Sequence, residues 1–112
     1  VNQYIEAYDQ FLNEARSAHP HTKIVCISLL YTKTKESPKT KITPDEYRVA
    51  LEQLVAQKRQ EGDKNLHFVA GDSITSVKNL RPDSPDPVHL GIYGASNFAR
   101  ELEKQIAPLL VK

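Results

Sequence analysis

The chain has 112 residues, enough for a single domain over 1–112, and its 39% hydrophobic and 26% charged residues are an ordinary balance for a globular protein. A formal net charge of +1 argues against a nucleic acid or an anionic membrane as partner, because both are attracted by a strong positive field. No apolar run approaches the roughly 18 residues that a membrane span needs. We therefore expect no nucleic-acid partner and no membrane span.

The chain opens on a predicted helix that ends near Ser17. Apolar side chains recur at steps of three and four residues, at Val1, Tyr4, Ile5, Tyr8, Phe11, Leu12 and Ala15. The helix should stop before Pro20, because a residue that precedes proline avoids the helical region. His19 and His21 flank this proline without a Cys or carboxylate at ligand spacing nearby. We interpret them as turn residues and expect no metal site.

A nearly continuous apolar run, Lys23–Leu30, predicts a strand that is covered on both faces, as in a parallel sheet. The single cysteine, Cys26, lies within this run, and we interpret it as a buried structural thiol rather than a nucleophile. The polar segment 31–42 contains Pro38 and four lysines without interleaved aromatic residues, which is typical of a solvated loop.

The second predicted helix has several agreeing start signals. Thr43 is suited to the N-cap, Pro44 fits the first helical position, and Glu46 can close a capping box onto Thr43. The apolar face comprises Tyr47, Ala50, Leu51, Leu54 and Val55. The helix should end at Glu61–Asp63, where Gly62 lies at the expected C-terminal place.

A second strand is predicted at Leu66–Ala70, within which His67 is interpreted as structural. A long loop follows, and then a last helix that begins near Gly94 or Ala95. Its apolar face comprises Ala95, Phe98, Ala99, Leu102 and Ile106, and Pro108 weakens its end. The order helix, strand, helix, strand, helix predicts one right-handed βαβ crossover, with the two strands adjacent and parallel.

The candidate chemistry lies in the loop before the last helix, at Asp86-Pro87-Val88-His89. An acid three residues before a histidine can turn toward it and accept a hydrogen bond from one imidazole nitrogen. This bond fixes the tautomer and leaves the other nitrogen of His89 available as a base, as in the supporting half of a Ser-His-Asp arrangement. The alternative is a solvated loop pair without chemistry, since this spacing is common.

The segment from Asp86 through Gly94, with Phe98 and Ala99, resembles the ending of the SGNH (GDSL-like) hydrolases. That family ends with a strand, a loop carrying Asp-Gly-Val-His or a close variant, a glycine a few residues later, and a closing helix. Pro87 is a departure, because the family commonly has glycine there. The resemblance implies the C-terminal part of a flavodoxin-like three-layer α/β/α sandwich of about five parallel strands.

The same resemblance implies the hydrolysis of an ester of a carbohydrate, lipid or small alcohol, without a cofactor. His89 would be the base and Asp86 its orienting carboxylate. In that family the nucleophilic serine lies in a Gly-Asp-Ser motif near the N-terminus, and a glycine and an asparagine complete the oxyanion hole. These segments would precede Val1. We therefore expect the missing N-terminal half of the same domain as partner, and little activity from these 112 residues alone.

A Gly-Asp-Ser also occurs at Gly71-Asp72-Ser73, after the second predicted strand. We interpret Ser73 as a loop residue, because the family's nucleophile lies far upstream of the Asp/His loop; Ser73 as nucleophile is the alternative. Two rival functions are a non-catalytic α/β interaction module and a phosphate-binding βαβ domain. The second is disfavoured, because neither strand leads into a glycine-rich loop before a helix.

Overall fold

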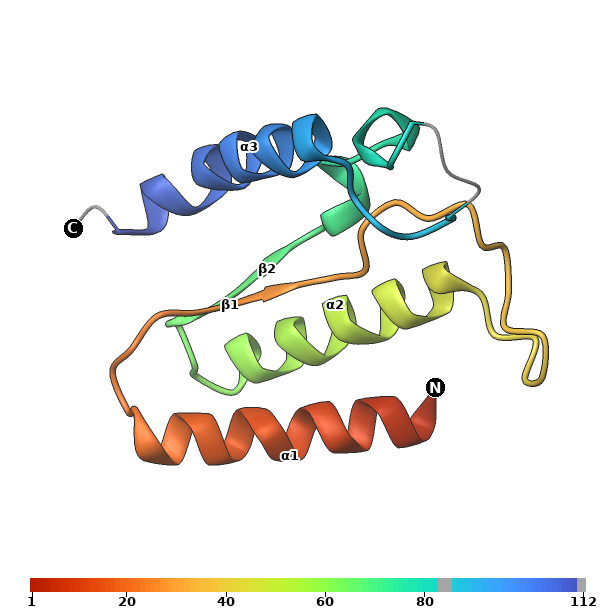
Figure 1. The fold of residues 1–112 in the computed structure, drawn as a ribbon. Coiled ribbons are helices and arrows are strands. Elements are labelled where there is room, and N and C mark those ends of the chain that lie inside the picture. The colour runs from red at the N-terminus through yellow and green to blue at the C-terminus, as the bar shows by residue number, and fades with distance from the viewer. Residues whose placement is uncertain (83–85, 111–112) are drawn as a thin grey trace.

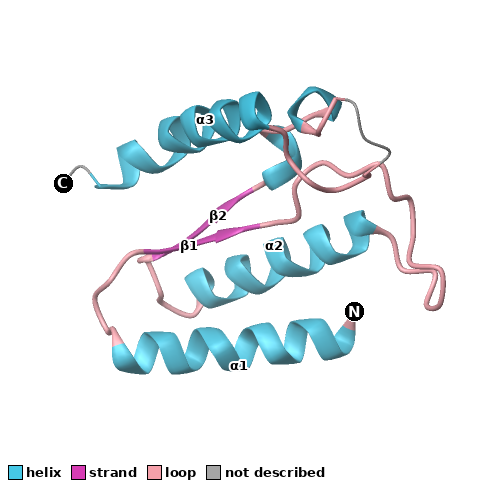
Figure 2. Cartoon of the chain, viewed as in Figure 1, coloured by secondary structure: helices cyan, strands magenta, loops and turns pink. Residues whose placement is uncertain are grey.

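The computed structural model describes residues 1–82 and 86–110, and in this part of the chain three helices flank a short parallel sheet (Figures 1 and 2). In chain order the elements are α1 (Asn2–Ala18), β1 (Ile24–Ile27), α2 (Pro44–Gln60), β2 (Leu66–Val69), the 3₁₀ turns η1 (Gly71–Ser73) and η2 (Val77–Asn79), and α3 (Ile92–Leu110). Helices α1 and α2 lie on one side of the strands and α3 on the other (Figure 1). The predicted α/β class is confirmed.

The two strands are adjacent and parallel, as predicted, and α2 connects them. Their register pairs Ile24 with Leu66, Val25 with His67, Cys26 with Phe68 and Ile27 with Val69. The prediction of a strand over Lys23–Leu30 was too long at both ends, because β1 covers only Ile24–Ile27. Beyond β1, the carbonyls of Leu29 and Leu30 accept hydrogen bonds from the Arg48 side chain, at 2.9 and 2.7 Å, rather than from a neighbouring strand.

The core lies between the sheet and the helix pair α1 and α2. Its buried members are Leu12, Cys26, Leu51, Leu54, Val55 and Leu66. Cys26 is 2% exposed, as expected of a structural thiol, and burial raises the pKa of its thiol. Burial of these side chains drives α1 and α2 onto one face of the strands.

The start of α2 matches its prediction. The Thr43 hydroxyl accepts the Glu46 N–H at 3.2 Å, and the Glu46 carboxylate accepts the Thr43 N–H at 2.6 Å, which completes the capping box. Pro44 is the first helical residue. The helix ends at Gln60, and Gly62 has a φ of 119°, a backbone conformation that favours glycine.

The segment between β2 and α3, predicted as one loop, contains two 3₁₀ turns. β2 stops one residue short of Ala70, because the Ala70 carbonyl accepts the Ser73 N–H at 3.1 Å and closes η1. In η2 the Ser76 hydroxyl accepts the Lys78 N–H at 3.3 Å, and Asn79 Oδ1 accepts the Ser76 N–H at 2.9 Å. Short polar side chains therefore order backbone that a hydrophobic pattern does not assign.

Helix α3 begins at Ile92, two or three residues before the predicted start near Gly94 or Ala95. The Gly91 carbonyl accepts the Ala95 N–H at 2.8 Å, so the helical hydrogen bonds start earlier. Gly94 is buried against η2, where a Cβ atom would lie 1.8 Å from the Asn79 carbonyl oxygen. This glycine therefore serves close packing rather than the start of the helix.

The apolar face predicted for α3 is only partly covered. Phe98, Leu102 and Ile106 are half-buried, whereas Ala95 and Ala99 are exposed. Pro108 lies inside the helix, which continues to Leu110. None of the helices in the described ranges has the length and apolarity of a membrane span.

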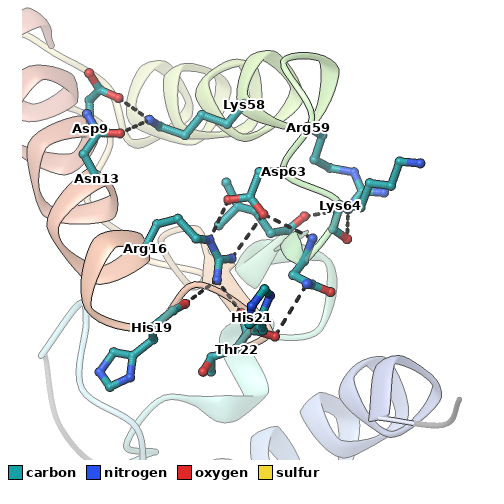
Figure 3. A network of polar contacts seen from close by, with 12 residues as sticks. Asp9, Asn13, Arg16, His19, His21, Thr22, Lys58, Arg59, Asp63 and Lys64 are labelled. Atoms are coloured by element: carbon teal, nitrogen blue, oxygen red, sulfur yellow. Dashed lines mark hydrogen bonds and ion pairs between the residues drawn. The ribbon is translucent and has the colours of Figure 1, made fainter.

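A polar network occupies the amino edge of the sheet, where both strands begin (Figure 3). The Arg16 guanidinium donates to both Asp63 carboxylate oxygens, at 2.9 and 3.2 Å, and to the carbonyls of His19 and Thr22, at 2.8 and 2.6 Å. These contacts join the end of α1 to the turn that precedes β2.

Candidate active site

Asp86 and His89 lie against each other, as the sequence predicts. Asp86 Oδ1 accepts the N–H groups of Val88 at 3.0 Å and His89 at 3.1 Å, and Asp86 Oδ2 contacts His89 Nδ1. A carboxylate at Nδ1 favours the tautomer with the proton on Nδ1 and leaves Nε2 as the basic nitrogen. The His89 side chain is 74% exposed, so its ring is open to a reactant.

The environment favours the ionised form of Asp86. The N–H of Val88 is the largest influence that lowers the pKa of the Asp86 carboxyl, and the N–H and ring of His89 add to it. A carboxylate that accepts several hydrogen bonds is stabilised in its charged form. Asp86 can therefore orient the ring and stabilise an imidazolium.

The Asp86–His89 loop is held at the carboxyl edge of the sheet, where both strands end. The Pro87 carbonyl accepts the Lys33 N–H at 3.0 Å and the Thr32 hydroxyl at 3.1 Å. On the other side, the His89 carbonyl accepts the Arg81 N–H at 3.2 Å. The loop is thus hydrogen-bonded to the segment that follows β1 and to the segment that follows η2.

The buried Asn79 connects this loop to α3, a role that the sequence analysis missed. Its carbonyl accepts the Gly91 N–H at 3.0 Å, and its side-chain amide donates to the Gly94 carbonyl at 2.9 Å and to Asn97 Oδ1 at 3.1 Å. The Ser-x-x-Asn spacing from Ser76 is a capping signal that could have found it. Asn79 fixes where the chain leaves the loop and enters the helix.

Arg48 was also missed, although it shapes the same edge from α2. Besides the carbonyls of Leu29 and Leu30, it pairs with Asp45 at 2.7 Å, and its Nε lies 3.8 Å from an Asp72 oxygen. The i, i+3 spacing of Asp45 and Arg48 was the available signal, but it predicts only a surface pair. The contacts to the carbonyls arise from the tertiary fold.

The contacts of Gly71-Asp72-Ser73 fit a turn. The Gly71 N–H donates to the Ser28 hydroxyl at 2.9 Å, and a Cβ atom at Gly71 would lie 2.1 Å from the Ser28 carbonyl oxygen. The Ser73 hydroxyl donates to the Ala70 carbonyl at 2.7 Å. In the described residues no hydrogen bond joins Ser73 to His89. Close packing on β1 thus accounts for the glycine, and turn closure for the serine.

An apolar groove of about 380 Å³ adjoins the Asp86–His89 loop. Its walls include Leu29, Leu30, Tyr31, Pro44 and Val88, the residue that precedes His89. A second groove, of about 440 Å³, runs from Val1 to α2 and is lined in part by Asp45 and Glu46. None of its walls belongs to the Asp86–His89 loop, so the smaller groove is the one relevant to the pair.

The remaining histidines do not form a comparable site. His19 and His21 are exposed, and their carbonyls, rather than their rings, accept hydrogen bonds from Arg16 and Asn65. Burial, followed by the charge of Arg59, lowers the pKa of His67. Across residues 1–82 and 86–110, no group of three or more His, Cys, Asp or Glu side chains could hold a metal ion.

Comparison with known proteins gives one functional hint. No protein-family profile and no curated protein matches the chain. Among solved structures, the chain is similar to the salicylyl-acyltransferase SsfX3 from a tetracycline biosynthetic pathway, with a TM-score of 0.79 and 25% sequence identity. The similarity covers 96% of this chain but 32% of that protein, so the chain spans about a third of the acyltransferase. It supports the α/β fold.

Proposed function

We propose that this chain supplies the His-Asp half of a Ser-His-Asp esterase of the SGNH type. The observation that carries the proposal is the contact between Asp86 Oδ2 and His89 Nδ1, on a ring that is open at the carboxyl edge of the sheet. Open α/β sheets bind their ligands at this edge. The name of SsfX3 adds support, since acyl transfer can use the same base.

The proposed reaction proceeds through an acyl-serine. His89 Nε2 accepts the serine proton as the serine oxygen attacks the ester carbonyl carbon. His89 then returns that proton to the alcohol oxygen as the bond from the carbonyl carbon to that oxygen breaks. Water then attacks the carbonyl carbon of the acyl-serine and gives a proton to His89. His89 returns this proton to the serine oxygen as the bond from that oxygen to the acyl group breaks, which releases the carboxylic acid. Asp86 holds the ring and stabilises the imidazolium throughout.

The serine and the oxyanion donors belong, in this proposal, to the upstream half of the same domain. Among the described residues, β1 pairs with β2 alone, so its other edge offers backbone hydrogen-bonding groups to a further strand. A further parallel strand, paired along the free side of β1, would extend the sheet beside the Asp86–His89 loop. The proposed partner is another part of the same protein, and the proposed substrate is an ester.

A non-catalytic interaction module is the second candidate. It is favoured by the lack, within the described residues, of a hydroxyl hydrogen-bonded to His89. Such a module would keep the fold and the loop but would not react with an ester. The two candidates therefore differ in an assay of the full-length protein.

The test uses the full-length protein with p-nitrophenyl acetate and a fluorophosphonate probe that labels reactive serines. We expect His89→Ala to lower kcat/KM by about 10³-fold or more, because the serine loses its base. His19→Ala is the matched control, and it should leave kcat/KM unchanged because His19 lies at the amino edge. Full activity of His89→Ala would refute the esterase.

Ser73 is tested in the same assay. Ser73→Ala should retain activity and labelling, because the Ser73 hydroxyl closes a turn onto Ala70. The 112 residues alone should hydrolyse the ester no faster than free imidazole does. If they are active, and Ser73→Ala abolishes that activity, the nucleophile is Ser73 and the upstream serine is not needed.

A further inference from the structure

We propose that the apolar groove beside Val88 binds the alcohol portion of the ester, and that this enzyme prefers esters of apolar alcohols with one ring or a short chain. The inference rests on the proposed function and assigns one side of its substrate. Leu29, Leu30, Pro44 and Val88 give the groove aliphatic walls, and Tyr31 gives it an aromatic one. Binding an apolar group to such a surface is favourable, because it removes apolar area from water.

The proton path decides which side of the ester lies in the groove. Asp86 holds His89 Nδ1, so protons are exchanged at Nε2. The alcohol oxygen takes its proton from Nε2 and must therefore lie within hydrogen-bond reach of His89. The rest of the alcohol extends from that oxygen along surfaces next to this residue. Val88 precedes His89 in the loop and is itself a wall of the groove.

The size of the groove limits the alcohol. A cavity of about 150 Å³ is enough for benzene, and pockets for small molecules start at roughly 300 Å³. At about 380 Å³ the groove accommodates one aromatic ring with a short linker, or a short alkyl chain. A polar sugar would leave the hydroxyl groups that face the aliphatic walls without hydrogen-bond partners.

Thr32 and Thr34 also line the groove, and several polar atoms beside it are already paired within the protein. Arg48 holds the carbonyls of Leu29 and Leu30. The Thr32 hydroxyl donates to the Pro87 carbonyl and accepts the Thr34 N–H at 3.0 Å. The Thr32 bond also joins the segment that follows β1 to the loop that carries Val88. The two walls of the groove are therefore held together before a ligand binds.

The experiment compares two ester series on the full-length enzyme. Methyl, butyl and benzyl acetate vary the alcohol, and methyl acetate, butyrate and benzoate vary the acyl group. We expect kcat/KM for benzyl acetate to exceed that for methyl acetate by about tenfold. Val88→Ser should reduce this benzyl-to-methyl ratio by about fivefold or more, because it makes one wall of the groove polar. Leu29→Ser should act in the same direction, which guards against a local effect at Val88.

Ile92→Ser is the matched control. Ile92 is an apolar residue near the same loop and is 88% exposed, but it is not a wall of the groove. Its benzyl-to-methyl ratio should equal that of the wild type. Circular dichroism of each variant checks that it is folded.

The possible failures are distinct. An active enzyme whose alcohol ratio is the same in both groove variants overturns this inference and leaves the esterase intact. A change confined to the acyl series also overturns it, because the groove would then hold the acyl group. A wild-type protein that hydrolyses no ester of either series overturns the proposed function and this inference with it.

Discussion

At the amino edge of the sheet, Asp63 receives two hydrogen bonds from Arg16, and both side chains are largely covered. At the carboxyl edge, Asp86 receives two backbone N–H groups and turns its second oxygen to the exposed ring of His89. Both acids order a turn next to a strand. Only the second leaves an ionisable ring open to a reactant.

The histidines make the same contrast. Figure 3 shows the His19 ring directed away from Arg16, which donates a hydrogen bond to the His19 carbonyl. His89 instead offers its ring to the neighbouring acid. A histidine contact therefore indicates acid-base chemistry only when the ring, rather than the backbone, makes it. We expect changes at the amino edge to alter stability, and changes at the carboxyl edge to alter activity.

Among the changes that compare the two edges, Asp86→Asn has the largest expected effect, and this effect is on catalysis. The amide stabilises the wrong tautomer of His89, so kcat of the full-length enzyme should fall by about 10³- to 10⁴-fold, less than or similar to the loss in His89→Ala. Steady-state hydrolysis of p-nitrophenyl acetate measures this loss.

Asp63→Asn is the matched change at the amino edge, and it should keep kcat within about twofold, since Asp63 pairs with Arg16 away from the loop. Equal losses of activity in the two variants would show that the edges do not differ in the way we describe.

Gly94→Ala tests how the carboxyl edge is supported. The new methyl group would meet the Asn79 carbonyl oxygen at 1.8 Å, so α3 or η2 must move. We expect a loss of about 1–3 kcal/mol in the free energy of unfolding, measured with urea. Gly91→Ala is the control, because its Cβ atom would have no neighbour closer than 3.4 Å. A Gly94→Ala variant as stable as Gly91→Ala would contradict the packing of α3 on η2.

Arg16→Met tests the amino edge. The side chains of Arg16 and Asp63 are 22% and 24% exposed, between a surface pair and a buried one. We expect the free energy of unfolding to fall by about 1–2 kcal/mol, with little change in kcat. Arg100→Met removes only an exposed contact to Ser96 and should change stability by less than about 0.5 kcal/mol. A loss of activity without a loss of stability in Arg16→Met would refute our comparison.

The sequence predicted what local chemistry determines. The capping box at Thr43, the order of the elements, the parallel pairing of the strands and the contact between Asp86 and His89 all follow from nearby residues or from the chain order. The carboxyl end of β1 and the start of α3 did not, because they depend on Arg48 and Asn79, which reach across the fold. The groove at Val88 is likewise formed by segments far apart in the chain.

The smallest expected effect concerns the acid stability of the Asp86–His89 loop. The folded state lowers the pKa of Asp86 below its ordinary 3.8, so the folded protein binds this proton more weakly than the unfolded chain does. The contribution to stability is therefore complete above about pH 4 and is lost as the pH falls through the lower, folded pKa.

Two variants show which contact causes this shift. Asp86→Asn should remove this part of the acid dependence, measured as the free energy of unfolding between about pH 2.5 and pH 6. His89→Ala should retain part of it, because the N–H of Val88 is the largest single cause of the lowered pKa of Asp86 and the backbone N–H of residue 89 also remains. Such a result would mean that the backbone of its own turn orders Asp86, whereas the side chain of Arg16 orders Asp63. The ring of His89 would then be positioned by an acid that does not depend on it. If His89→Ala instead loses the acid dependence as fully as Asp86→Asn, the ring is the main partner, and the loop depends on the pair rather than on the backbone.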